Sequence, residues 1–127
     1  MTEAKYVVFD GMDGSGKGTQ IKHLEEKLSG RVIFTREPGG TPFAEEIRKL
    51  LLSNSLAGKS TALNNFFLFW AAREELQENF VLPALQSGKH VFSDRGDVID
   101  VCIPALRRRK RTALARVHIY AAIGLRR

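Results

Sequence analysis

The sequence has little cysteine and no long apolar run. A single cysteine, Cys102, excludes a disulfide within the chain and is typical of a protein of the reducing cytoplasm. No apolar run approaches the ~20 residues that span a bilayer, and no basic-then-apolar signal segment opens the chain. Internal repeats and low-complexity linkers are also lacking. We therefore expect a cytoplasmic globular protein whose 127 residues form one domain and which does not bind membranes.

Excess positive charge is missing from most of the chain and concentrated at its end. Residues 1–98 hold 12 Lys/Arg and 13 Asp/Glu, whereas residues 99–127 hold 8 Lys/Arg and one Asp. Arg107–Arg111 is a continuous basic run without interleaved aromatic residues, so we favour a solvated or disordered tail over nucleic-acid binding. The charge break predicts two parts, residues 1–98 and a basic tail of residues 99–127.

A glycine loop with one lysine lies between an expected buried strand, Lys5–Asp10, and an expected helix, Lys17–Leu28. Its spacing, Gly11-x4-Gly16-Lys17, fits the P-loop, in which backbone N–H groups and the lysine surround a phosphate. Gly18 stands where the pattern has Ser or Thr, and Thr19 follows one residue late. The combination of strand, loop, lysine and helix predicts a phosphate site.

A second strand, Arg31–Thr35, would complete a β-loop-α-β unit and so indicates a parallel sheet. The next segment, Thr35–Pro42, holds two prolines and two glycines, which favour a tight loop. Such a loop is either a surface connection or, because it carries Arg36 and Glu37 past a strand end, part of a ligand site.

Two helices and a third strand, His90–Asp94, are expected further along. Residues Pro42–Leu52 and Ser60–Gln86 have helical apolar spacing. Arg48 either lines a site or lies in solvent, and for Phe69, which shares a helix face with Arg73, the pattern favours core packing. The side chains expected to face the core are Ile47, Leu50, Leu51, Leu63, Phe66, Phe67, Trp70 and Leu76.

Asp94 and Arg95 follow the third strand. A carboxylate beside a P-loop could hold Mg²⁺ or its waters, and a neighbouring arginine could stabilise phosphate charge. The alternative is a plain turn with a surface ion pair, a credible interpretation for Asp97. Beyond this point Ile99–Ile103 is a short apolar extension, and Ala113–Leu125 has helical spacing, with Val117–Ile123 the best candidate for a substitute strand or helix.

Over residues 5–98 the chain resembles the bacterial thymidylate kinases. The resemblance rests on six segments in order, of which the Arg-Glu-Pro-Gly-Gly-Thr loop is the most specific. The segments are Phe9–Gln20, Thr35–Thr41, Glu46–Leu52, Leu68–Arg73, Pro83–Leu85 with Gly88, and Ser93–Arg95.

The resemblance implies a P-loop nucleoside-monophosphate-kinase fold, with a parallel sheet flanked by helices, and transfer of phosphate from ATP to dTMP with Mg²⁺. Lys17, Arg95 and Asp13 would be catalytic, and Asp94 would hold the metal through water. Residues implied for ATP are Gly11, Asp13, Gly14, Ser15, Gly16, Lys17, Gly18 and Thr19. Residues implied for dTMP are Asp13, Arg36, Glu37, Arg48, Phe69, Arg73 and Arg95, with Phe69 stacked on thymine and Pro38 in a cis peptide.

The sequence departs from the family in three places. Gly18 replaces a hydroxyl residue, which makes direct ligation of Mg²⁺ by the loop doubtful. Ser15 stands where some members carry a catalytic arginine. After Arg95 the expected Ser-Ser and Ala-Tyr-Gln residues, the later strands and the lid have no counterpart. We interpret this as a truncated or frame-shifted thymidylate kinase whose residues 99–127 are read out of frame.

An incomplete domain has consequences for stability and activity. We expect one edge of the strand at Lys5–Asp10 to lie unpaired, which promotes aggregation, and turnover to be low or absent. The alternatives are a catalytically dead nucleotide-binding fragment and a kinase for another nucleoside monophosphate. The resemblance also implies a homodimer formed through helices.

Overall fold

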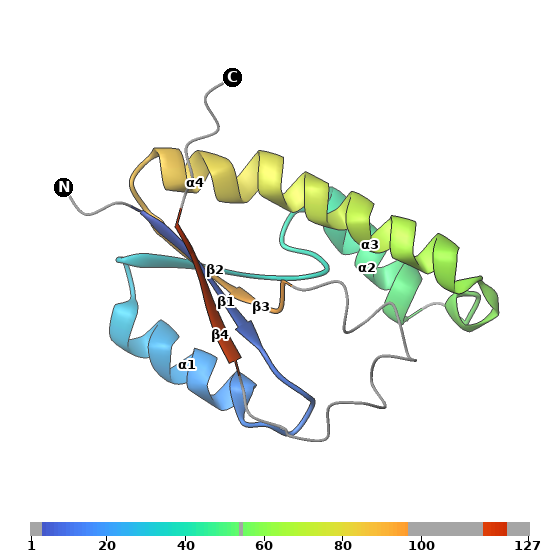
Figure 1. Ribbon diagram of the computed structural model, residues 1–127, viewed down its shortest axis with the longest axis horizontal. Helices are drawn as coiled ribbons and strands as arrows, with labels where there is room; N and C mark the ends of the chain where they lie inside the picture. Colours follow the sequence, from blue (N-terminus) through green and yellow to red (C-terminus); the bar gives the residue numbers. More distant parts are fainter. Residues whose placement is uncertain (1–3, 54, 97–115, 122–127) are drawn as a thin grey trace.

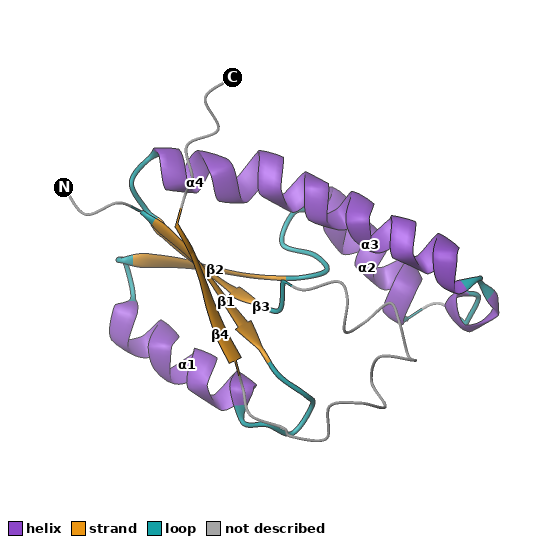
Figure 2. Cartoon of the chain, viewed as in Figure 1, coloured by secondary structure: helices purple, strands orange, loops and turns teal. Residues whose placement is uncertain are grey.

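The computed structural model describes residues 4–53, 55–96 and 116–121, which form a four-stranded sheet with helices on both faces (Figures 1 and 2). The elements are β1 Lys5–Asp10, α1 Lys17–Leu28, β2 Val32–Arg36, α2 Pro42–Leu52, the 3-10 turn η1 Ala57–Lys59, α3 Ala62–Leu76, the π-helix η2 Gln77–Val81, α4 Leu82–Gln86, β3 His90–Asp94 and β4 Arg116–Ala121. No helix in the described ranges has both the length and the apolar character needed to cross a membrane.

The first three strands are parallel, as predicted, in the order β2-β3-β1. Their register pairs Phe9 of β1 with Asp94 of β3, and Asp94 with Arg36 of β2. The carboxyl ends of all three strands therefore meet at one edge of the sheet, where parallel sheets bind their ligands.

The fourth strand corrects two expectations about β1 and the tail. Antiparallel β4 pairs with β1 from Lys5 opposite Ala121 to Asp10 opposite Arg116, so this edge of β1 is not unpaired. The helix considered for Ala113–Leu125 is wrong over residues 116–121. The substitute strand considered for Val117–Ile123 is confirmed over residues 117–121, where Val117 and Ile119 bring β propensity and β1 offers unpaired backbone groups. The basic run and Ile99–Ile103 lie outside the described residues.

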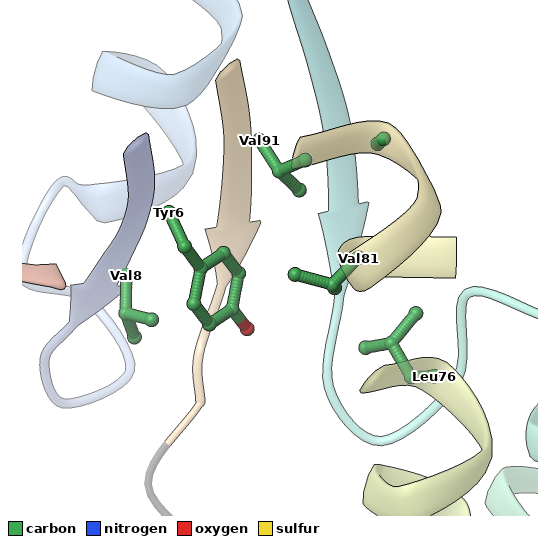
Figure 3. Packing of buried hydrophobic residues seen from close by; sticks show 6 residues of the cluster. Tyr6, Val8, Leu76, Val81 and Val91 are labelled. Atoms are coloured by element: carbon green, nitrogen blue, oxygen red, sulfur yellow. The ribbon is translucent and has the colours of Figure 1, made fainter. Parts of the chain in front are cut away.

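Each face of the sheet carries its own set of apolar side chains. On the face towards the long helical rod α3–η2–α4, Tyr6, Val8 and Val91 pack with Leu76 and Val81 (Figures 1 and 3). On the other face, which α1 covers, the rings of Phe9, Phe92 and Phe34 form a row with centroids 5.5 Å apart. The alternation of strand side chains between faces produces this division.

The rod was predicted as one helix, Ser60–Gln86, and runs from Ala62 to Gln86 with a wide turn inside it. In η2 the N–H of Leu82 donates to the carbonyl of Gln77, five residues earlier. A regular helix would bring the ring of Pro83 against the carbonyl four residues before it, and the wider turn accommodates that ring. Gly88, with φ of 80°, follows the end of the rod.

A second apolar cluster joins α2 to α3. It contains Ala44, Ile47, Leu51, Phe69 and Ala72, with Phe66 partly buried against it. The prediction that Leu50, Leu63, Phe67 and Trp70 face the core is wrong, since these side chains are 40–61% exposed. Helix α3 carries apolar residues around most of its circumference, so its spacing alone does not identify the face that packs on α2.

Leu76 offers a test of this packing because its side chain is fully buried. We expect Leu76→Ala to lower the free energy of unfolding by about 2–5 kcal/mol, through lost apolar contacts and the cavity left behind. The matched control Leu56→Ala, at a 60% exposed position before η1, should change it by less than about 0.5 kcal/mol. Urea unfolding followed by circular dichroism measures both, and equal losses would contradict the packing.

Candidate functional site

Backbone hydrogen bonds join the three strand ends into one rigid edge. The N–H of Glu37, just past β2, donates to the carbonyl of Asp94 at 3.0 Å. The N–H of Arg95, just past β3, donates to the carbonyl of Phe9 at 2.8 Å. The segments that carry the predicted site residues are therefore held together by the main chain before any side chain contributes.

The glycine loop between β1 and α1 has the backbone that a phosphate cradle requires. Gly14 and Gly16 both have φ of 82°, a conformation that favours glycine. Gly16 precedes α1 without offering a side-chain cap to the first-turn N–H groups. The buried Oγ of Ser15 has no hydrogen-bond partner in the described part of the chain. These donors and the positive end of the helix macrodipole suit an anion.

Two ion pairs connect this loop to the end of β3. The ammonium of Lys17, the first residue of α1, pairs with Asp94, and the guanidinium of Arg95 pairs with Asp13. Lys17 is buried, whereas Asp13 is exposed. The pairs place Asp94 and Arg95 at the glycine loop, and their roles in a ligand site stay predictions. Asp97 lies outside the described residues.

The backbone of Arg95 is held in an uncommon conformation. Its φ is 69°, in the left-handed region, which costs of order 1–3 kcal/mol for a residue other than glycine. The N–H bond to Phe9 fixes one side of this residue, and the buried hydroxyl of Ser93 donates to its carbonyl at 2.7 Å. These bonds direct the side chain back towards Asp13.

The loop after β2 is organised around Glu45 of α2. Arg36 donates two hydrogen bonds to its carboxylate, at 3.2 and 2.9 Å, and the N–H of Gly40 donates a third at 2.8 Å. The bond from Arg36, followed by that from Gly40, lowers the pKa of Glu45. The Glu37–Pro38 peptide is cis, which confirms the expectation from the resemblance.

Arg48 is half-buried rather than fully in solvent, and its role in a ligand site stays a prediction. Its guanidinium donates to the carbonyl of Pro38 at 2.7 Å. Burial lowers the pKa of Arg48, and the positive charges of Arg36 and Arg95 lower it further, with opposing contributions from Glu45 and Asp94. Arg36, Arg48 and Arg95 come from three segments and lie close enough for their charges to affect one another. Such an arrangement of positive charges is suited to an anionic ligand.

Arg73 and Phe69 lie differently from one another although they share a helix face. Arg73 places its Nε 3.9 Å from Oε2 of Glu37 and its guanidinium carbon 5.4 Å from the centroid of the Trp70 ring. Phe69 is 7% exposed within the α2–α3 cluster. The structure thus shows the core packing that the helical pattern favoured, and stacking of Phe69 on a base remains a prediction.

Two polar residues near the site were not predicted. Tyr6 of β1 donates its hydroxyl to Oε1 of Glu37 at 3.0 Å, and the side-chain amide of Gln77 lies 3.4 Å from both groups. A tyrosine inside an otherwise apolar strand is the one signal in the sequence, since a buried hydroxyl needs a partner.

For a metal, the described residues contain no group of three His, Cys, Asp or Glu side chains, but Asp13 and Asp94 supply carboxylate oxygens at the loop.

Comparison with known proteins gives a consistent result. A family model described as thymidylate kinase matches residues 9–109. The thymidylate kinase of Pelotomaculum thermopropionicum is 48% identical over 96 residues, covering 73% of this chain and 44% of the relative. That of Colwellia psychrerythraea is 41% identical over 101 residues, covering 77% and 48% respectively. The crystal structure of thymidylate kinase from Ehrlichia chaffeensis is similar with a TM-score of 0.67 and 36% identity, covering 75% of this chain and 55% of that one.

Two features of these matches concern the extent of the chain. The chain spans about half the length of the curated relatives it matches. The family match continues to residue 109 and so crosses the charge break at residue 98. The structural match confirms the expected fold.

The bonds to Glu45 predict a pH dependence of stability. Because the folded-state pKa of Glu45 is lowered, its contribution is present above the ordinary value of 4.5 and is lost as pH falls through the folded value. We expect Glu45→Gln to reduce the free energy of unfolding at pH 7 and to reduce it less at pH 3. Denaturant unfolding at both pH values measures this, with Glu46→Gln, at an exposed carboxylate paired with Lys49, as the matched control. An equal loss at both pH values would contradict the assignment.

Proposed function

The chain belongs to the thymidylate kinase family, and on that basis we propose that it binds ATP and dTMP at the carboxyl edge of its sheet. The reaction is transfer of the terminal phosphoryl group of ATP to dTMP, giving ADP and dTDP. The observation that carries the proposal is the convergence of the glycine loop with Arg36, Arg48 and Arg95 at this edge. Two negatively charged substrates require two such groups of donors.

The glycine loop is the proposed site of the ATP phosphates. Lys17 supplies the positive charge, and the N–H groups at the start of α1 supply hydrogen bonds. The buried hydroxyl of Ser15 is one further donor. The full set proposed for ATP is Gly11, Asp13, Gly14, Ser15, Gly16, Lys17, Gly18 and Thr19.

The segments after β2 and β3 are the proposed site of dTMP. Asp13 contacts the sugar 3′-hydroxyl, and Arg36, Arg48 and Arg95 meet the phosphate. Glu37, Arg73 and Phe69 shape the base pocket, with Phe69 stacked on thymine.

The chemistry requires positioning and charge neutralisation and no covalent intermediate. The proposed catalytic residues are Lys17, Asp13 and Arg95. Lys17 exchanges its contact with Asp94 for phosphate oxygens when ATP binds. The released carboxylate of Asp94 suits Mg²⁺ held through water, because Mg²⁺ commonly takes one or two carboxylates together with phosphates and waters. When bound, the metal neutralises phosphate charge.

We propose that turnover is low or absent. Ser15 occupies the place of a catalytic arginine, and the residues that follow Arg95 do not match those that recognise thymine in the resemblance. A binding protein without catalysis, or a kinase for another nucleoside monophosphate, is the second candidate.

The proposed boundary between the kinase part and the basic tail remains at residue 98, where the charge changes. The single cysteine supports a cytoplasmic location.

Binding and turnover together test the function. Calorimetry should show binding of ATP and dTMP, and an ADP-release assay should show little dTDP formation. Lys17→Ala should weaken ATP binding about 10- to 100-fold and Arg48→Ala should weaken dTMP binding similarly, since each removes a charged hydrogen-bond donor. Lys22→Ala, at an exposed position of α1, is the matched control and should change neither.

Several outcomes would contradict parts of this proposal. Failure of the folded protein to bind either nucleotide would overturn the function. Tighter binding of AMP or dCMP than of dTMP would change the acceptor. Turnover comparable to that of a full-length relative would overturn only the expectation of low activity.

We also propose a homodimer formed through α2 and α3. Phe43 of α2 and Leu63, Phe67 and Trp70 of α3 are exposed apolar side chains, 45–61% accessible. Exposed apolar groups in this number mark an interaction surface.

Sedimentation tests the homodimer. We expect the protein to sediment as a dimer and Phe67→Glu to sediment as a monomer, because a charge in the interface would lose its hydration on association. Leu56→Glu, at another exposed position before η1, should remain dimeric. A monomer at all protein concentrations would contradict the proposal.

A further inference from the structure

Glu37 is a charged side chain in an unusually buried place. It is 7% exposed, although a carboxylate away from water is costly unless other groups compensate it. Its compensating partners come from three elements: Tyr6 of β1, Arg73 of α3 and Gln77 at the start of η2. Because these partners come from distant parts of the chain and surround one carboxylate, together they fix its position.

The two oxygens of this carboxylate have different partners. Oε1 accepts the hydroxyl of Tyr6 at 3.0 Å and the amide of Gln77 at 3.4 Å, whereas Oε2 lies 3.9 Å from Nε of Arg73. The bonds to Oε1 fix the rotation of the carboxylate and thereby direct Oε2 to Arg73. By distance Tyr6 contributes the stronger bond and Gln77 the weaker one.

The rod of helices places Gln77 and Arg73 together. They are four residues apart where α3 passes into η2, so they lie on one face of the rod. Gln77 is the first residue of the wide turn, and its carbonyl accepts the N–H of Leu82. Wide turns of this kind recur at functional sites.

Tyr6 is suited to act as a permanent donor. Burial raises the pKa of its hydroxyl well above its ordinary value, and the negative charge of Glu37 raises it further, so the hydroxyl keeps its proton at neutral pH. Figure 3 shows the ring among Val8, Val81 and Val91, with its oxygen on the side of Leu76. The apolar packing therefore fixes the ring from which the hydrogen bond is made.

We infer that Tyr6 and Gln77 are positioning residues that act through Glu37 to orient the Arg73 guanidinium towards the acceptor nucleotide. The inference rests on the proposed function, because it takes Arg73 as a contact of dTMP. Nε of Arg73 faces Oε2 of Glu37, and its guanidinium carbon lies over the Trp70 ring, so both contacts restrict where the guanidinium can lie. Neither Tyr6 nor Gln77 touches substrate.

Nucleotide binding by three variants tests the inference. Tyr6→Phe removes the donor and keeps the ring, and Gln77→Leu removes the weaker donor. We expect the Kd for dTMP to rise about three- to tenfold in Tyr6→Phe and about two- to threefold in Gln77→Leu, while the Kd for ATP stays within about twofold. Gln86→Leu is the matched control, the same change at an exposed position of α4.

A double-mutant cycle separates positioning from a merely structural role. If Tyr6 acts through Arg73, then adding Tyr6→Phe to Arg73→Ala should cause no further loss of dTMP affinity. Additive losses, or equal weakening of ATP and dTMP, would overturn the inference. Circular dichroism checks that each variant is folded, and if Tyr6→Phe unfolds, the cycle of Gln77→Leu with Arg73→Ala decides.

Failure of the underlying function gives a distinct result. If the unsubstituted, folded protein does not bind dTMP, both the proposed function and this inference are wrong. If it binds dTMP and Tyr6→Phe binds it equally well, only the inference is wrong.

Discussion

The register between β1, β3 and β2 is the constraint on which the rest of this structure depends. It sets Phe9, Asp94 and Arg36 side by side, and the bonds from Arg95 to Phe9 and from Glu37 to Asp94 continue it past the strand ends. A shift by one residue would exchange the faces of every strand side chain. It would move Tyr6 out of the core and separate Lys17 from Asp94. Core packing and site geometry are thus consequences of the same backbone pairing.

Four cations of the site are paired with acids within the protein, whereas Arg48 donates to the carbonyl of Pro38. Lys17 pairs with Asp94, Arg95 with Asp13, Arg36 with Glu45, and Arg73 with Glu37. Such pairs hold the cations in place and limit the net positive charge. Under the proposed function, a phosphate would replace an existing carboxylate partner at Lys17 and Arg95, so part of its binding energy would be offset by the contact that it breaks. Arg36 and Arg73 can keep their partners, because Glu45 and Glu37 hold the two arginines in place from within the protein.

The sequence predicts local elements well and distant relationships poorly. The bounds of β1, α1, α2 and β3 follow from apolar periodicity and from glycine and proline. The packed face of α3 does not, because apolar residues surround the helix. For Val117–Ile123 the sequence left a strand and a helix open, and the pairing with β1, more than a hundred residues earlier, decides for the strand. In the site, the glycine loop and Arg95 follow from motif and strand order. The contact between Tyr6 and Gln77 exists only after the sheet and the rod have packed together.

The direction of β4 determines which end of this strand lies at the edge of the sheet that carries the glycine loop. A strand parallel to β1 would end at the ligand edge, and the residues after it would reach the site. Because β4 is antiparallel, it begins there, with Arg116 opposite Asp10, and ends at the far edge, with Ala121 opposite Lys5. The carboxyl end of β4 therefore lies at the side of the sheet away from the glycine loop. The polarity of one edge strand thus decides which of its two ends lies beside the candidate site.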